Sequence, residues 1–149
     1  MSEDNKRILR RLLEALDTGN LAVVEELVSP DFVTHHPRSP DHRGGPEAVK
    51  QASALFRTAF HDLRFTIEDM IAEGDMVAFR WIARGTHTGE YFGIPPTGES
   101  VEFRGMEFDR FSHGKVEERW VNWDTLGLFQ QLGIVPELGQ LLPQCRPER

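Results

Sequence analysis

The sequence predicts an α+β fold: a cone-shaped barrel in which N-terminal helices pack in a strongly curved, mixed or antiparallel sheet that encloses an apolar pocket. Apolar residues recur at helical spacing before His61 and alternate with polar residues after it. Helices followed by a run of strands with short turns are typical of α+β domains, which carry their helices on one face of the sheet. The open end of such a cone is a natural place for a pocket.

Three helices are expected at the start of the chain. Apolar residues at helical spacing over 8–16 predict the first, and residues 21–28 predict a second, shorter one. Pro46 opens the third, because the first turn of a helix suits proline. The stretch 32–43 is rich in Pro and His and lacks apolar periodicity, so we expect a brief strand followed by a surface loop.

Strands follow, joined by short turns and closed by a short helix over 125–132. The expected strands cover Phe65 and Ile67, residues 77–83, residues 100–112 and residues 116–124. In the strand over 100–112 the apolar positions shift register between Phe103 and Met106. A slip of one residue turns every later side chain to the other face, so we expect a bulge at Gly105.

Length and composition favour one domain over residues 1–149, with a core at about 5–132 and a Pro-rich tail over 133–149 that contains the single cysteine, Cys145. No apolar run approaches the ~18 residues of a membrane span. The N-terminus lacks the apolar centre of a signal peptide, so we expect no membrane contact and a cytoplasmic location. The net charge is −7, and the absence of a basic cluster with interleaved aromatic residues excludes nucleic-acid binding.

The last strand carries the candidate catalytic group. Trp120, Asn122 and Asp124 share one face by alternation, so if Trp120 faces the cone, the other two do as well. A carboxyl among aromatic side chains would be partly desolvated, which raises its pKa and suits a general base acting on a carbon acid. The competing interpretation is that Asp124 caps the helix that begins at Thr125.

Five segments, which together span most of residues 8–132, carry a resemblance to a known family. They are residues 32–37, 44–48, 59–63, 85–98 (GTHTGEYFGIPPTG) and 114–124. Their sequence and order resemble those of the SnoaL-like polyketide cyclase and ester cyclase family. Two positions depart from the family's pattern: Arg119 stands where a histidine is often found, and Val121 where an acidic residue often follows the tryptophan.

The resemblance implies a fold similar to that of nuclear transport factor two, with a cone-shaped cavity and frequent dimers. It also implies ring closure by an intramolecular aldol reaction without metal or cofactor, in which the aspartate at the end of the last strand is the base. That position is Asp124 here. Asp124 would remove a proton from a carbon flanked by carbonyls, and the enolate would attack a second carbonyl of the same substrate.

His87 is a second candidate catalytic residue. By alternation it lies on the same face as Trp81, so it could donate to the developing oxyanion; a histidine that only shapes a turn or an edge is the competing interpretation. Residues expected to bind substrate are His36, Phe79, Trp81, Tyr91, Phe108, Trp120 and Asn122. His35 is the alternative to His36 at the mouth of the pocket. Core packing, or a structural hydrogen bond for Asn122, is the alternative role for these residues.

The expected partners are a small hydrophobic or polyketide-like molecule and a second copy of the chain, which would cover the apolar face of the sheet as a homodimer. No cofactor is expected. No metal is expected either, because adjacent His35 and His36 point to opposite faces of an extended segment and no pair of histidines has the i, i+4 spacing of a zinc helix.

Three other functions stay open. A ketosteroid-isomerase-like proton shift also uses a carboxylate base, but it needs an acid in its oxyanion hole, and Tyr91 is the only tyrosine. An epoxide hydrolase would need an aspartate, an arginine and a second aspartate in the pocket, for which Arg110 and Asp69 are candidates. The third is a binding module that holds a small molecule or a protein without catalysis.

Overall fold

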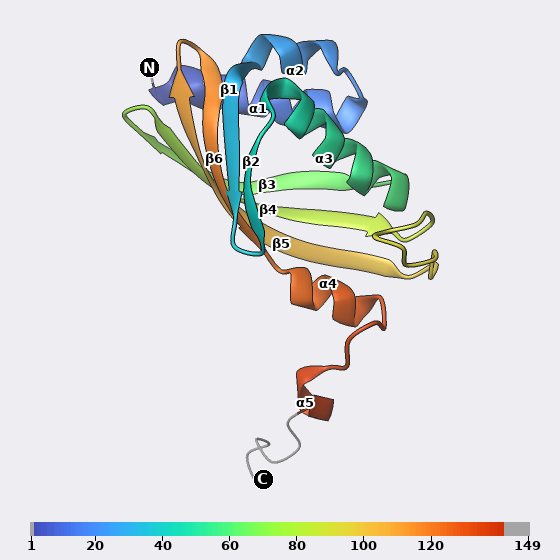
Figure 1. Ribbon diagram of the computed structural model, residues 1–149. Coiled ribbons are helices and arrows are strands. Elements are labelled where there is room, and N and C mark those ends of the chain that lie inside the picture. Colours follow the sequence, from blue (N-terminus) through green and yellow to red (C-terminus); the bar gives the residue numbers. More distant parts are fainter. Residues whose placement is uncertain (1, 142–149) are drawn as a thin grey trace, which may run out of the picture.

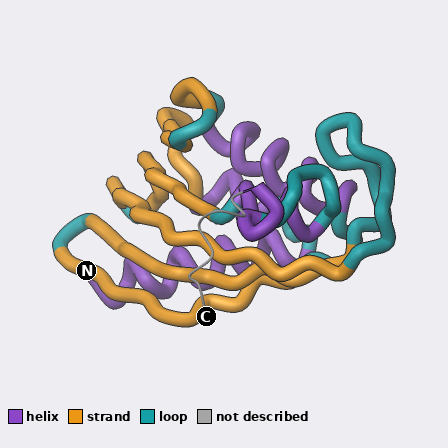
Figure 2. The backbone as a smooth tube through the Cα atoms, turned by 90° about the horizontal axis from the view of Figure 1, so that it is seen from below, coloured by secondary structure: helices purple, strands orange, loops and turns teal. Residues whose placement is uncertain are grey.

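A six-stranded sheet organises the structure, a computed structural model that describes residues 2–141. Its strands are ordered β2-β1-β6-β5-β4-β3, and each pairs antiparallel with its neighbour except β1 and β6, which are parallel. The strands are β1 (Val28–His36), β2 (Ser39–Arg43), β3 (Arg64–Glu73), β4 (Met76–Thr86), β5 (Ser100–Ser112) and β6 (Lys115–Trp123). The sheet is strongly curved but open, with β2 and β3 at its edges (Figure 2).

The helices cover the concave side of this sheet or follow its last strand (Figure 1). They are α1 (Ser2–Thr18), α2 (Ala22–Leu27), α3 (Gly45–Ala59), α4 (Thr125–Gln131) and α5 (Leu138–Leu141). Leu9 and Leu12 on α1 and Val49 on α3 are buried in one core with the inward side chains of the strands. The α+β prediction is therefore confirmed. No helix among residues 2–141 is both long and apolar enough to cross a membrane.

The region over residues 32–43 differs from the prediction. Instead of a brief strand and a loop, it forms part of a hairpin in which β1 pairs with β2, and β1 continues the sheet beside β6. All five residues of β2 are exposed. An edge strand with both faces in solvent needs no alternating apolar pattern, which is why the sequence did not reveal it.

The faces of β5 also differ from the prediction. Its pairing with β4 runs without irregularity from Ser100 to Arg110, so the bulge expected at Gly105 is wrong. The inward positions continue past Phe103 and Gly105 to Glu107 and Asp109, both of which are buried. The apolar side chains that suggested the register shift, Met106 and Phe108, are 64% and 52% exposed on the outer face.

Gly105 has a packing role in place of the expected bulge. A Cβ atom at this position would overlap the indole of Trp81 and lie 2.8 Å from Cβ of Trp123. Because glycine has no side chain, the indole of Trp81 can pack directly against the backbone of Gly105 on the concave face.

Gly105→Ala is expected to lower the free energy of unfolding by about 1–3 kcal/mol, because the added methyl group displaces the indole of Trp81. Urea unfolding followed by tryptophan fluorescence measures this loss. Met106→Ala, at the neighbouring exposed position, is the matched control and is expected to stay within about 0.5 kcal/mol of the wild type. Equal stability of Gly105→Ala and the wild type would show that Trp81 does not need this space.

Candidate active site

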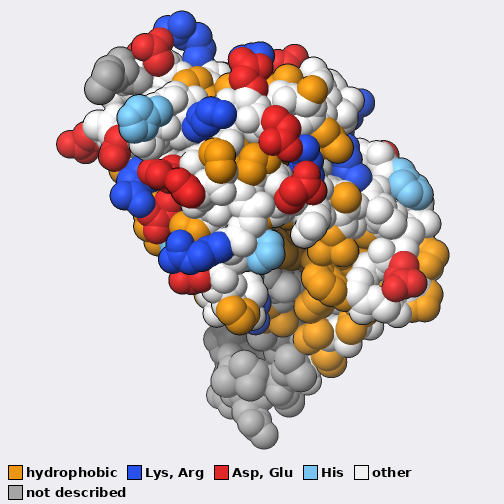
Figure 3. All heavy atoms as spheres, turned by 45° about the horizontal axis from the view of Figure 1, so that its top comes forward, with side chains coloured by type: hydrophobic (Ala, Val, Ile, Leu, Met, Phe, Trp, Pro, Cys, Tyr) orange, Lys and Arg blue, Asp and Glu red, His pale blue; other side chains and the backbone are white. Residues whose placement is uncertain are grey.

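A cavity of about 270 Å³ lies between the helices and the concave face of the sheet. Its apolar wall consists of Leu13, Leu16, Val49, Ala52, Phe56, Leu63, Phe65, Trp81, Phe103, Val121 and Trp123. Its polar residues are Thr34, His36, Ser53, Arg57, Glu107 and Arg119. Figure 3 shows hydrophobic side chains gathered around a hollow in the molecular surface. Apolar walls with a few polar groups are typical of sites that bind small molecules.

Strand β6 contributes to the cavity with the face opposite to the one predicted. Arg119, Val121 and Trp123 line the cavity, whereas Trp120 is 39% exposed on the outer side. The alternation along the strand was correct, but the assumption that Trp120 faces the cone was wrong. Arg119 alternates with Trp120 along β6 and is therefore one of the polar groups of the cavity.

Arg119 joins β6 to β5 through a buried ion pair. Its Nε and Nη2 donate to Oδ1 and Oδ2 of Asp109 at 2.8 and 2.7 Å, and Asp109 is fully buried. Such a bidentate, charge-assisted pair is among the strongest polar contacts in proteins. A second carboxylate shares the cation, because Oε2 of Glu107 lies 3.1 Å from Nε of Arg119.

Glu107 is the more weakly satisfied carboxylate of this cluster. The indole Nε1 of Trp81 donates to its Oε1 at 3.1 Å. Oε2 receives no hydrogen bond from the described residues, because the one N–H on Nε of Arg119 is aimed at Asp109. Burial raises the pKa of Glu107 to about 7, with a smaller contribution from Asp109 in the same direction and with Arg119 and Trp81 opposing it.

His36, which is predicted to bind substrate, lies on the cavity wall. Its Nδ1 accepts a hydrogen bond from the backbone N–H of Arg38 at 3.1 Å, which places the proton of the neutral ring on Nε2. Nε2 is buried and has no partner among the described residues. Burial, followed by the charge of Arg38, lowers the pKa of His36, so the ring offers an unused N–H donor.

Asp124 lies outside this cavity. Its Oδ1 accepts from the backbone N–H of Gly127 at 2.8 Å and so caps α4. With Asn122, it lines a separate groove of about 330 Å³ on the other face of the sheet. The two sites share the tryptophans of the cavity wall, since Trp81 and Trp123 also border this groove.

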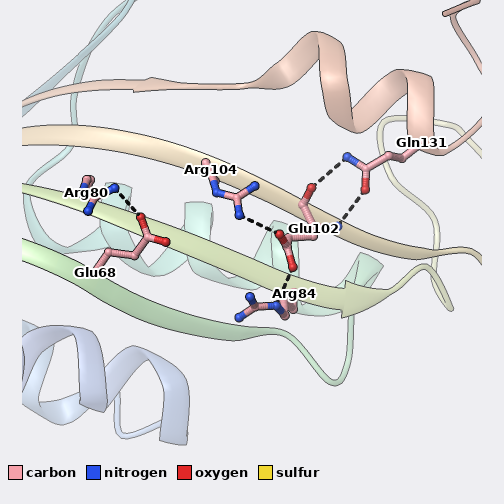
Figure 4. Close-up of polar contacts among 6 residues, drawn as sticks. All are labelled: Glu68, Arg80, Arg84, Glu102, Arg104 and Gln131. Atoms are coloured by element: carbon pink, nitrogen blue, oxygen red, sulfur yellow. Dashed lines mark hydrogen bonds and ion pairs between the residues drawn. The ribbon is translucent and has the colours of Figure 1, made fainter.

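A polar network on the outer face holds α4 beside β5 (Figure 4). Gln131 bonds both the backbone N–H and the carbonyl of Glu102 at 2.8 Å. The Glu102 side chain accepts from Nε of Arg84 at 2.6 Å and pairs with Arg104 at 2.9 Å. These contacts hold the C-terminal end of α4 against β5. At the start of the helix, the backbone N–H of Asp124 donates to the carbonyl of Arg104 at 2.9 Å.

The other predicted site residues are distributed over the core and the surface. Trp81 lines the cavity, but Phe79 is buried in the core, and Phe108 lies on the outer face. His87 and Tyr91 are buried residues of the loop between β4 and β5, where Nδ1 of His87 accepts from the backbone N–H of Thr97 at 3.1 Å. The structure thus brings His36 and Trp81 together at the cavity and leaves the remaining candidates outside it.

The buried cluster of Arg119 with its two carboxylates, Glu107 and Asp109, was not predicted from the sequence. A signal for the two carboxylates exists, because Val101, Phe103, Glu107, Asp109 and Phe111 continue one alternating face from end to end of β5. The Arg110 and Asp69 pair suggested for an epoxide hydrolase lies on the outer face instead, where Asp69 binds Arg80.

The raised pKa of Glu107 gives a prediction for the pH dependence of stability. Between its ordinary pKa of 4.5 and the folded-state value of about 7, the folded protein binds more protons than the unfolded chain, so the free energy of unfolding falls as pH rises. Glu107→Gln removes this contribution. Its stability relative to the wild type should therefore rise between about pH 5 and about pH 7.5, as measured by urea unfolding at each pH. The exposed Glu73→Gln is the control, and a pH-independent difference for Glu107→Gln would contradict the prediction.

The chain is similar to proteins of one known family over most of its length. The sequence model of the SnoaL-like polyketide cyclase family matches residues 6–132. The aklanonic acid methyl ester cyclase AcmA of Streptomyces galilaeus is 28% identical over 126 residues, which cover 84% of this chain and 88% of that protein. The nogalonic acid methyl ester cyclase of Streptomyces nogalater is 28% identical over 125 residues, covering 82% and 92%.

Solved structures show the same similarity. IdmH from Streptomyces antibioticus is 32% identical with a TM-score of 0.75, and the match covers 87% of this chain and 98% of IdmH. AclR from Streptomyces galilaeus is 27% identical with a TM-score of 0.82, covering 97% and 90%. The family match extends over most of the chain, and the chain belongs to the SnoaL-like polyketide cyclase family.

Proposed function

We propose that this protein is a cofactor-independent cyclase that closes a ring in a polyketide-like ester bound in the cavity. The observation that carries the proposal is an apolar cavity of about 270 Å³ with few ionisable groups on its wall. Two relatives at 28% identity that cover most of the chain are ester cyclases by name, which supports the same class of substrate.

The reaction is an intramolecular aldol addition. A base removes a proton from a carbon between two carbonyl groups, and the resulting enolate carbon attacks another carbonyl of the same molecule. One C–C bond forms, the attacked carbonyl becomes an alkoxide, and this oxygen takes up a proton. The product has the same composition as the substrate, so no oxidant, reductant or cofactor takes part.

The family resemblance assigns the role of base to Asp124, and this stays a prediction. Asp124 caps α4 and lines the outer groove. It can act on a bound ester only where the substrate extends into that groove, past Trp81 and Trp123, which border both spaces.

Aklanonic acid methyl ester and nogalonic acid methyl ester are the substrates to test first. Incubation with the protein in the presence of EDTA, followed by liquid chromatography and mass spectrometry, should give a new product of unchanged mass. If neither ester is converted faster than in buffer, the proposed activity towards this substrate class is wrong.

A matched pair of variants on α3 tests whether the reaction takes place in the cavity. Ala52 and Ala54 lie on the same helix and are both exposed, but only Ala52 lines the cavity. Ala52→Trp should fill part of the cavity and lower kcat/KM at least about tenfold, equivalent to about 1.4 kcal/mol in the barrier, while Ala54→Trp should leave it unchanged. Equal activity of the two variants would place the reaction elsewhere.

We also propose that a second copy of the chain covers the outer face of the sheet. Ile71, Phe108 and Trp120 are exposed there, and they lie in one row across neighbouring strands, with Ala78 between the first two. Met106 adds a further exposed apolar side chain beside this row. A contiguous apolar patch of this kind is typical of a protein interface. In an isologous dimer the same patch is used by both copies, so each copy would bury the patch of the other.

Phe108→Glu should convert the proposed dimer into a monomer, because it places a charge in the centre of the apolar row. Light scattering coupled to size-exclusion chromatography measures the mass at micromolar concentration. Leu21→Glu changes an exposed apolar residue outside the sheet and should leave the dimer intact. A monomeric wild type would contradict the proposal.

A further inference from the structure

The reaction described above gives no role to the buried carboxyl group of the cavity. Glu107 lies on the inward face of β5 and lines the same cavity as Trp81 and Arg119. The carboxylate that the family resemblance selects, Asp124, lies on the other side of the sheet. Of these two carboxylates, only that of Glu107 borders the apolar cavity.

We propose that Glu107 is the proton-transfer residue of the cavity, which takes the acidic C–H proton of the bound substrate and returns it to the oxyanion. The substrate class in this statement rests on the proposed function. The proton moves from carbon to the Glu107 carboxylate, the C–C bond forms, and the alkoxide then takes the proton back from the carboxylic acid. Glu107 ends as a carboxylate again, so the cyclisation neither consumes nor releases a proton.

The unequal hydrogen bonding of the two inward carboxylates supports this role. Both oxygens of Asp109 accept hydrogen bonds from Arg119, so Asp109 serves as the counter-ion. Glu107 accepts one hydrogen bond, from Trp81, among the described residues, although a carboxylate offers about four acceptor sites. Glu107 is therefore the member of the cluster with capacity to accept a proton.

The charge balance of the cluster points the same way. One guanidinium, that of Arg119, faces two buried carboxylates, so ionised Glu107 leaves an uncompensated negative charge in an apolar cavity. Of the other ionisable groups on the wall, Arg57 on α3 is already paired with Asp17 at 2.7 Å, and His36 on β1 has a lowered pKa. Proton uptake by Glu107 removes the excess charge, in agreement with its pKa of about 7.

His36 supplies the complementary donor. Its Nε2 proton is buried and has no acceptor among the described residues, and the ring lies on the wall of the same cavity as Glu107. A neutral imidazole N–H can stabilise an oxyanion as the enolate forms. The cavity thus holds a proton acceptor, Glu107, and a neutral N–H donor, Nε2 of His36.

A carbon acid that needs no cyclase activity tests the inference directly. The probe is 5-nitrobenzisoxazole: a base removes its ring C–H proton, the N–O bond breaks, and the electron pair ends on oxygen as a coloured cyanophenolate. The full-length wild type should accelerate this elimination over buffer, with a rate that rises with pH around a midpoint near 7. A midpoint near the ordinary glutamate pKa of 4.5, or no acceleration over buffer, would overturn the proposal.

Variants identify the residue. Glu107→Gln should lower the rate about 100-fold or more, as expected for loss of a general base, while the exposed Glu73→Gln should not. Glu107→Asp restores a carboxylate and should recover part of the rate, which a merely structural role of Glu107 would not require. Loss of rate in Asp124→Asn together with full rate in Glu107→Gln would overturn the proposal. Circular dichroism of each variant checks the fold, and if Glu107→Gln does not fold, the pH midpoint of the wild type decides.

The ester assay separates this inference from the proposed function. Elimination that depends on Glu107, in a protein that converts neither ester, would leave the inference standing and remove the proposed cyclase activity. Conversion of an ester by the wild type and Glu107→Gln at the same rate would keep the proposed function and overturn the inference.

Discussion

The structure of the site depends on the buried ion pair between Arg119 and Asp109. It links β5 to β6 on the concave side and determines which face of each strand is inward. Because side chains alternate along a strand, an inward Arg119 requires that Trp120 point outward, and an inward Asp109 does the same for Phe108. One buried polar contact thus sets the lining of the cavity and the composition of the outer surface.

Most helices and strands could be predicted from periodicity, but the edge strand β2, the helix α5 and the faces of β5 and β6 could not. The prediction placed the large apolar residues inside, and for Phe108 and Trp120 this rule fails because two acids and an arginine occupy the inward positions. Arg119 compensates the charge of Asp109, and proton uptake by Glu107 removes the negative charge that would be left over. Recognising this cluster from sequence requires the pairing of Asp109 with Arg119 across two strands, which periodicity within one strand does not give.

Asp124 shows why a site residue is harder to predict than an element. A carboxylate at the junction of a strand and a helix satisfies two requirements equally well in the sequence, that of a helix cap and that of a base. The structure shows the cap, with Gly127 as donor and Gln131 tying α4 to β5. His36 was selected for a pocket role on weaker grounds, yet it lies on the cavity wall. Strand β1 extends further than its sequence suggested and ends at this histidine.

Glu107 and Asp109 have the same charge, lie two residues apart on one strand and face the same cation, yet they differ in their chemistry. Asp109 takes both hydrogen bonds that Arg119 directs at this pair, so it remains a counter-ion. Glu107 is left with the indole of Trp81, which reaches it only because Gly105 has no side chain. The arrangement that leaves this carboxylate poorly solvated and reactive near neutral pH is the same one that lowers the stability of the folded protein there. The chemistry of the cavity therefore follows from how one arginine is shared and from the missing side chain of one glycine.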